Sequence, residues 1–230
     1  MNKTYRIALM GNPNTGKSTL FNALTGLRQH TGNWAGKTVE LKEGTFEFKN
    51  KTYKMIDLPG SYSLYSNSLD EEVARNYLLF EKPDLTVVVL DATALERNLN
   101  LALQVLEISK NVIICFNLMD EAEKNGMKIN APYFMRKLGV PVVKISARNK
   151  TGIPALLDTM DRILDGVIEC HPTPIIYDSE TEANIQYLEE KLKKIFPNDI
   201  PTRWLAIRLL DGDHSLIKAI EEKYFSLEVH

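Results

Sequence analysis

The sequence predicts an α/β fold with a mostly parallel six-stranded sheet, followed by a small all-helical domain. Short apolar stretches typical of buried strands alternate with segments of helical periodicity, and this alternation favours parallel strands covered by helices on both faces. After two prolines, Pro172 and Pro174, only helical periodicity continues. We therefore place a domain boundary between residues 1–168 and residues 169–230.

The expected strands and helices follow one another in a regular order. Strands are expected around Ile7, Val39, Met55, Val88, Ile114 and Val143. Helices are expected over residues 18–27, 72–80, 98–108, 133–138 and 153–164. Residues 39–48 and 52–56 are joined by only three polar residues, 49–51, which indicates a hairpin and hence one antiparallel edge.

A phosphate-binding loop connects the first strand to the first helix. Residues 11–18 read GNPNTGKS, which fits the pattern G-x-x-x-x-G-K-S. Such a loop points backbone N–H groups and a helix dipole at an anion, while the lysine adds a charge and the serine a magnesium ligand. The predicted nucleotide contacts here are Asn12, Pro13, Asn14, Thr15, Gly16, Lys17, Ser18 and Thr19.

Two further motifs predict that the base is guanine. Asp120, in the sequence Asn117-Leu118-Met119-Asp120, follows an apolar strand and can accept the N1–H and the exocyclic amine of guanine. Adenine lacks this pair of donors, and such a mismatch costs roughly 10⁴- to 10⁵-fold in discrimination. The segment Ser146-Ala147-Arg148, after another strand, is predicted to present a backbone N–H to the guanine carbonyl oxygen.

The magnesium ligands and the switch segments are expected on either side of the hairpin. Asp57 and Gly60, in the sequence DLPG, supply a carboxylate for magnesium and an N–H for the γ-phosphate. Thr38 is the expected second hydroxyl ligand beside Ser18. Loss of the γ-phosphate would release the segment that contains Thr38 and the segment that contains Gly60, as in an order-to-disorder switch.

These motifs resemble those of Ras-like P-loop GTPases, and the residues around them resemble one family more closely. Residues 32–40 (GNWAGKTVE), 57–64 (DLPGSYSL), 72–78 (EVARNYL) and 203–213 (RWLAIRLLDGD) are similar to the N-terminal cytosolic domain of ferrous iron transport protein B, FeoB. The resemblance implies a regulatory GTPase followed by a permease, at the cytoplasmic face of the bacterial inner membrane. Two residues depart from common patterns: Ala35 replaces a family proline, and Leu118 stands where most small GTPases carry lysine.

Hydrolysis is expected to be slow, because the usual catalytic side chains are missing. Ser61 occupies the place of a water-orienting glutamine, and neither Arg28 nor Arg75 is placed as an arginine finger. The resemblance suggests that potassium substitutes, held by Asn14 and by backbone carbonyls near Gly32 and Trp34. The expected catalytic set is Asn14, Lys17, Thr38 and Gly60.

Composition limits the other functions. The formal charge of −2 and the lack of a basic cluster argue against nucleic-acid binding. The longest apolar run is far below the roughly 18 residues of a membrane span, so this segment is expected to be soluble. Cys115 is expected in the core, and Cys170 beside His171 lacks the partners of a metal site. The alternatives are a free-standing ribosome-associated GTPase and a non-catalytic nucleotide sensor, and a homo-oligomer is left open.

Overall fold

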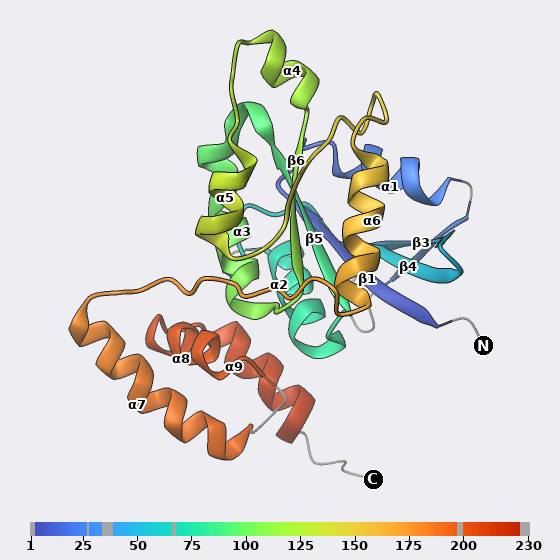
Figure 1. Cartoon of the computed structure of the whole chain (residues 1–230). Helices are drawn as coiled ribbons and strands as arrows, with labels where there is room; N and C mark the ends of the chain where they lie inside the picture. The colour runs from blue at the N-terminus through green and yellow to red at the C-terminus, as the bar shows by residue number, and fades with distance from the viewer. Residues whose placement is uncertain (1–2, 27, 34–38, 66–67, 197–199, 226–230) are drawn as a thin grey trace.

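A single sheet with helices on both faces forms the larger part of the molecule (Figure 1). The computed structural model describes residues 3–26, 28–33, 39–65, 68–196 and 200–225. Within them the sheet has seven strands in the order β2-β3-β4-β1-β5-β6-β7. The strands are β1 (Thr4–Gly11), β2 (Gln29–Asn33), β3 (Glu40–Phe48), β4 (Lys51–Asp57), β5 (Leu85–Asp91), β6 (Val112–Asn117) and β7 (Val142–Lys144).

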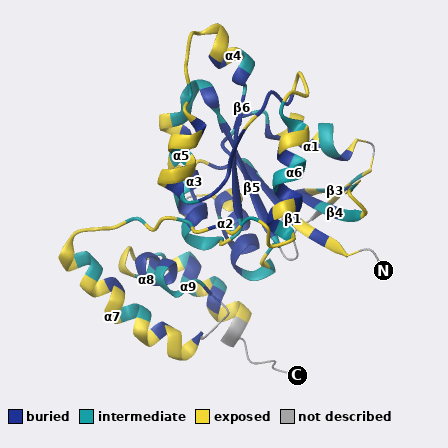
Figure 2. Cartoon of the chain, in the orientation of Figure 1, coloured by how far each residue is buried: buried dark blue, intermediate teal, exposed yellow. Residues whose placement is uncertain are grey.

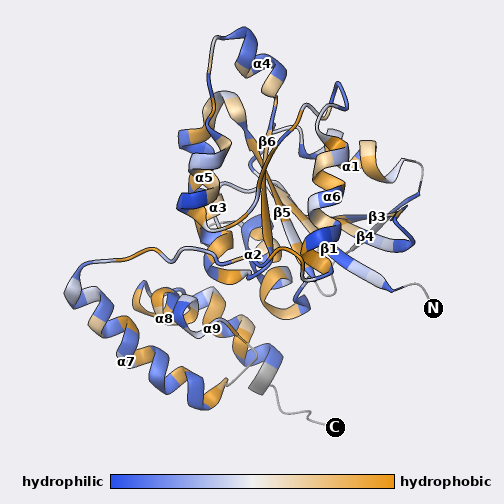
Figure 3. Ribbon diagram, in the orientation of Figure 1, coloured by the Kyte–Doolittle hydropathy of each residue, from blue (hydrophilic) through white to orange (hydrophobic). Residues whose placement is uncertain are grey.

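The central strands are parallel and buried. β1 pairs in parallel with β4 and β5, and β5, β6 and β7 continue the parallel order. Every residue of β6 is buried, and β5 and β6 are hydrophobic over most of their length (Figure 3). A strand covered on both faces needs apolar side chains at successive positions, which is why these runs do not alternate.

The expected count of six strands is wrong by one, because β2 forms an additional edge strand. Its sequence, QHTGN, contains no apolar residue, so hydrophobic pattern alone cannot reveal it. β2 pairs antiparallel with β3, from Gln29 opposite Gly44 to Asn33 opposite Glu40. This strand is therefore defined by backbone pairing at the sheet edge.

The predicted hairpin is confirmed as the antiparallel pair β3 and β4. Phe48 lies opposite Lys51, and both intervening residues, Lys49 and Asn50, have positive φ angles of 45° and 61°. A two-residue turn of this kind matches the right-handed twist of the strands it joins.

Two layers of helices cover the sheet. α1 and α6 lie on one face, and α2, α3 and α5 lie on the other (Figure 1). The structure divides the helix expected over residues 72–80, since α2 is followed by a π-helical turn, η1. The helices of this part are α1 (Lys17–Thr25), α2 (Leu69–Asn76), η1 (Tyr77–Glu81), η2 (Ala92–Ala94), α3 (Leu95–Ile108), α4 (Met119–Lys124), α5 (Ala131–Leu138) and α6 (Ile153–Leu164).

The C-terminal part is helical, as expected, and it has its own small core. It contains α7 (Ser179–Ile195), α8 (Thr202–Leu210), α9 (His214–Ile220) and the turn η3 (Glu221–Phe225). Trp204 is its largest buried side chain, at 2% exposure, and Leu79 of η1 belongs to the same hydrophobic cluster. The buried stripes of these helices face inward while much of α7 is exposed (Figure 2). A unit of this size buries little surface alone, so its packing against η1 completes its core.

Among the described residues, no helix combines the length and apolar character needed to cross a membrane.

Candidate functional site

The predicted phosphate loop lies between the end of β1 and the start of α1. Asn14 and Gly16 both adopt left-handed backbone conformations, with φ of 65° and 78°. A Cβ on Gly16 would lie 2.3 Å from Asn117 Nδ2, so only glycine fits at this position. The loop borders a cavity of about 530 Å³, lined by Asn12, Pro13, Asn14, Gly16, Lys17, Ser18, Thr19 and Gly60.

Lys17 and Asp57, predicted to serve phosphate and magnesium, contact each other in this structure. The Lys17 ammonium donates to Asp57 Oδ1 and also to the carbonyl oxygen of Leu58, 2.7 Å away. Both charged side chains are buried, with 10% and 7% exposure. A buried lysine needs such a partner, and the phosphates of a bound nucleotide would offer a second one.

The oxygen donors near the loop fit magnesium. Ser18 lines the cavity, and Asp57 presents a buried carboxylate beside it through its contact with Lys17. Hydroxyl and carboxylate oxygens are the hard ligands that magnesium prefers. The third predicted ligand, Thr38, lies outside the described residues, as does Trp34.

Polar groups without partners surround the phosphate end of the cavity. Among the described residues, both polar atoms of the Asn12 side chain and the hydroxyl of Ser61 are buried without a hydrogen-bond partner. The Ser61 backbone N–H bonds Gly11 O at 3.3 Å, which holds this segment against the loop. Gly60 packs over Pro13, where a Cβ would approach within 3.5 Å. Buried groups of this kind normally have partners, so they mark a place where a polar ligand would fit.

The predicted base-binding motifs meet at the carboxyl ends of β6 and β7. Asn117 joins three segments, because its Nδ2 donates to Thr15 O at 2.8 Å and its Oδ1 accepts from Ala147 N at 2.9 Å. Leu118 adopts a left-handed conformation, with φ of 61°, immediately before α4. A leucine there is strained, which is common at binding sites. The side chain of Arg148 is exposed.

Asp120 has an ionised carboxylate that can accept hydrogen bonds. The Ser146 hydroxyl is the largest influence that lowers the pKa of the Asp120 carboxyl below its ordinary value, so the group is ionised at neutral pH. Its Oδ2 accepts from Asn149 Nδ2 at 3.0 Å, whereas its Oδ1 is buried and has no hydrogen-bond partner among the described residues. An ionised carboxylate with unused acceptor capacity suits a ligand with two adjacent donors.

Asn149 is a residue that the sequence motifs did not single out. It lies one position after the predicted segment Ser146-Ala147-Arg148, and asparagine is an ordinary loop residue, so no pattern distinguishes it. Its contact joins two segments 29 residues apart, which only the tertiary structure reveals.

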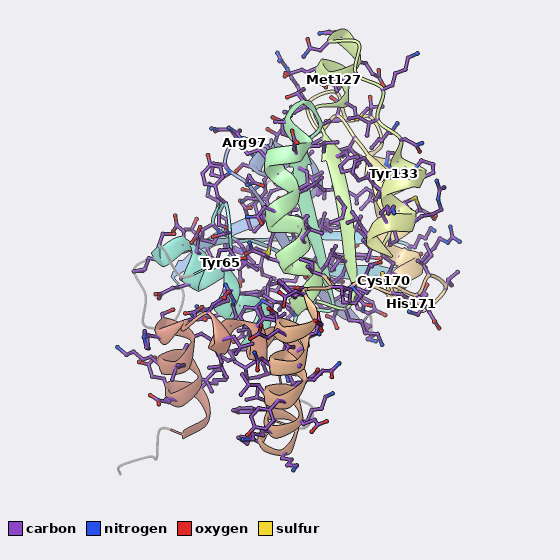
Figure 4. The ribbon with its side chains drawn as sticks, turned by 90° about the vertical axis from the view of Figure 1, so that its left-hand side faces the viewer. Tyr65, Arg97, Met127, Tyr133, Cys170 and His171 are labelled. Carbon is purple, nitrogen blue, oxygen red and sulfur yellow. The ribbon has the colours of Figure 1, made fainter. Side chains whose placement is uncertain are left out.

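The segment after Gly60 is tied to the helices beside it. The Ser63 hydroxyl donates to Glu71 in α2 at 2.9 Å, and Leu64 N donates to Gln104 in α3 at 2.6 Å. The ring of Tyr65, labelled in Figure 4, packs against the Arg208 guanidinium of α8, with 4.2 Å from Cζ to the ring centroid.

The Arg75 side chain contacts residues of the C-terminal helical part. Its side chain is fully buried, and Nη1 pairs with Asp213 Oδ2 at 3.2 Å and with the Ser215 hydroxyl at 3.0 Å. Burial lowers the pKa of the Arg75 guanidinium, and Asp213 opposes that shift. These contacts direct the Arg75 guanidinium to the helical domain.

Both cysteines are buried. Cys115 is fully buried in β6, where desolvation raises the pKa of its thiol. Cys170 donates weakly to Val112 O at 3.7 Å, and His171 is exposed beside Glu169 (Figure 4). No group of three or more metal-binding side chains is found in the part of the chain that the structure describes.

Two family models match the chain, one for each part. Residues 5–160 match the model described as "Ferrous iron transport protein B", and residues 177–229 match the "FeoB cytosolic helical domain".

Relatives and solved structures agree with these matches. The chain is 40% identical over 222 residues to a "Fe(2+) transport protein A/Fe(2+) transporter FeoB fusion protein" of Porphyromonas gingivalis, covering 95% of this chain and 26% of that protein. The chain thus spans about a quarter of the length of such curated relatives. The T. maritima FeoB cytosolic domain superimposes with a TM-score of 0.87 in a GDP form, at 37% identity and with 98% of this chain and 89% of that chain covered. The GMPPNP form of that domain gives a TM-score of 0.86 at 37% identity, covering 98% and 88%.

Proposed function

This chain belongs to the ferrous iron transport protein B (FeoB) family, as its N-terminal GTPase domain with the attached cytosolic helical domain, and on that premise we propose that it binds and slowly hydrolyses GTP to regulate ferrous iron transport. The observation that carries the proposal is the convergence of the phosphate loop with Asp120, linked through Asn117 and Thr15. We propose that residues 1–168 form the GTP-binding domain and that residues 169–230 form the helical regulatory domain.

Guanine recognition is assigned to the two segments after β6 and β7. The ionised Asp120 carboxylate would accept the N1–H and exocyclic amine of guanine. A backbone N–H of the segment Ser146-Ala147-Arg148 would donate to the guanine carbonyl oxygen, and in this structure the Ala147 N–H donates to Asn117 Oδ1. The Asn117 side chain links these segments to the phosphate loop through its hydrogen bonds to Thr15 and Ala147. The other proposed nucleotide contacts are the loop residues 12–19, Asp57, Gly60, Ser146 and Arg148.

Lys17, Ser18 and Asp57 are proposed to exchange partners when the nucleotide binds. Lys17 would leave Asp57 for the phosphates, and Asp57 would become free to hold magnesium together with Ser18 and Thr38. Magnesium supplies positive charge to the β- and γ-phosphate oxygens when it is bound. The exchange keeps both buried charges compensated, which avoids the cost of an unpaired buried ion.

Potassium is proposed to supply the positive charge that other GTPases take from an arginine. Asn14 lines the phosphate cavity, and Gly32 lies in β2, on the strand that leads toward Trp34. Among the described residues no arginine lines that cavity. Gly60 N–H and Thr38 complete the proposed catalytic set with Asn14 and Lys17.

A relay from the nucleotide to the helical domain is proposed through α2. Ser63 follows Gly60 and bonds Glu71, and Arg75 lies one helical turn further along α2, where it pairs with Asp213. Residues four apart share one face of a helix, so a movement of the switch segment would be passed along that face. The recipient would be the permease domain of the longer protein, with this region at the cytoplasmic face of the bacterial inner membrane.

The alternatives receive less support. The matches cover both parts of the chain with one transporter family, so a free-standing ribosome-associated GTPase is not favoured. A nucleotide sensor without hydrolysis differs from the proposal only in rate, and association of several copies is an open prediction.

Single-turnover GTP hydrolysis at matched ionic strength tests the proposal. We expect faster hydrolysis in potassium than in sodium for the parent, and no such difference for Asn14→Ala. Equal rates for both proteins in potassium would refute the role of Asn14, and a parent that binds GTP without hydrolysing it would support the sensor.

A further inference from the structure

Asn149 holds the carboxylate that is assigned to the base. Its Nδ2 donates to Asp120 Oδ2 at 3.0 Å, and its backbone N–H points to the Ser146 hydroxyl at 3.4 Å. The second carboxylate oxygen, Oδ1, is buried without a hydrogen-bond partner among the described residues. Two groups of the loop that follows β7 thus act on this carboxylate, since Asn149 donates to Oδ2 and the Ser146 hydroxyl lowers the pKa of the carboxyl.

The loop that carries Asn149 has a closely defined conformation. Ser146 and Thr151 exchange two backbone hydrogen bonds, of 3.0 and 3.1 Å, which close the loop at its base. Lys150 and Gly152 have positive φ angles of 57° and 77°, and a Cβ on Gly152 would lie 2.2 Å from Lys144 O. The position of the Asn149 amide is therefore set by the backbone, although the side chain is exposed.

We propose that Asn149 is a positioning residue for guanine recognition, which orients the Asp120 carboxylate so that it meets both the N1–H and the exocyclic amine of the base. This role rests on the proposed function. The terminal torsion of an aspartate has a broad, roughly two-fold profile, so an unrestrained carboxylate turns easily. Two parallel donors need one defined orientation of the carboxylate plane, whereas a single donor tolerates many.

A comparison of two bases isolates this role. Hypoxanthine keeps the N1–H and the carbonyl oxygen of guanine but lacks the exocyclic amine. Binding of IDP therefore depends less on carboxylate orientation than binding of GDP does. A residue that only stabilises the loop would affect both nucleotides equally.

The experiment measures the Kd of GDP and of IDP for the full chain with magnesium. For Asn149→Ala we expect GDP binding to weaken about three- to tenfold, as for the loss of one hydrogen bond to a charged group, and IDP binding to weaken less than about twofold. Asn149→Asp keeps the shape but places a second negative charge beside Asp120, so its loss of GDP affinity should be larger. Asn184→Ala, at an exposed asparagine of α7, is the matched control and should leave both constants unchanged.

The outcomes separate the role of Asn149 from the function of the site. Equal weakening of GDP and IDP in Asn149→Ala, or no change in either, overturns the positioning role while nucleotide binding stands. A parent chain that binds neither nucleotide overturns both. Equal unfolding temperatures of the parent and the variants verify that the fold is intact.

Discussion

Replacing Asp213 by asparagine tests the buried junction between α2 and the helical domain. The Arg75 side chain is fully buried, and that of Asp213 is 7% exposed. Asp213 also caps α9, because its Oδ1 accepts from Leu216 N at 3.0 Å. Asparagine keeps this cap but removes the negative charge, so the variant isolates the ion pair.

The expected loss of stability follows from burial. Removing one partner of a buried ion pair costs about 3–5 kcal/mol, and because Ser215 and an amide oxygen remain as acceptors for Arg75, we expect about 2–3 kcal/mol for Asp213→Asn. Asp213→Ala also loses the cap, which adds about 1 kcal/mol. Glu190→Gln, which removes one negative charge from an exposed position of α7, is the control and should cost less than about 1 kcal/mol.

Urea unfolding followed by tryptophan fluorescence measures these differences. The chain has two tryptophans, so a Trp34→Phe background leaves Trp204 as the reporter inside the helical core. If Asp213→Asn costs no more than Glu190→Gln, the ion pair does not stabilise the junction. The proposed relay also predicts faster GDP release in Asp213→Asn, and an unchanged release rate would refute it.

Two further predictions concern the base and the acid stability of the helical domain. Asp120→Asn should weaken GDP binding at least tenfold and improve binding of XDP, because xanthine carries a carbonyl in place of the exocyclic amine and the asparagine amide can donate to it. Competition between labelled GDP and XDP measures this preference. An unchanged preference for GDP would contradict the assignment of Asp120. Glu182 is paired with Arg203, which lowers the pKa of its carboxyl from 4.5 to about 2. A lowered folded pKa stabilises the protein above pH 4.5, and this contribution is lost as pH falls toward 2, so Glu182→Gln should lower the unfolding temperature at pH 7 and match the parent near pH 2. A difference that persists unchanged across that range would count against the pair.

Elements held by buried apolar side chains could be predicted from the sequence, whereas elements held by backbone pairing could not. The strand around Val88 is predicted from its apolar run, because a strand buried on both faces needs apolar side chains at successive positions, and the structure has β5 there. The strand β2 was missed because its backbone pairs with β3 while its side chains carry no apolar pattern. The helix α4 was likewise not expected, since its six residues are too few to show a period.

The candidate site divides in the same way. Lys17, Asp57, Asn117 and Asp120 were named from spacing, because a phosphate loop and a guanine pocket need particular residue types in a particular order. The spacing could not reveal that Lys17 and Asp57 are each other's partners here, or that Asn149 holds Asp120.

The amino-acid sequence by itself determined the α/β class, the nucleotide motifs and the family, since these depend on local pattern and on residue order. Only the tertiary structure decided how the two domains are joined, because Arg75 and Asp213 lie 138 residues apart, in two segments whose resemblance to the family does not reveal that they touch. A buried charge is stable only beside its partner, and that partner is chosen by packing.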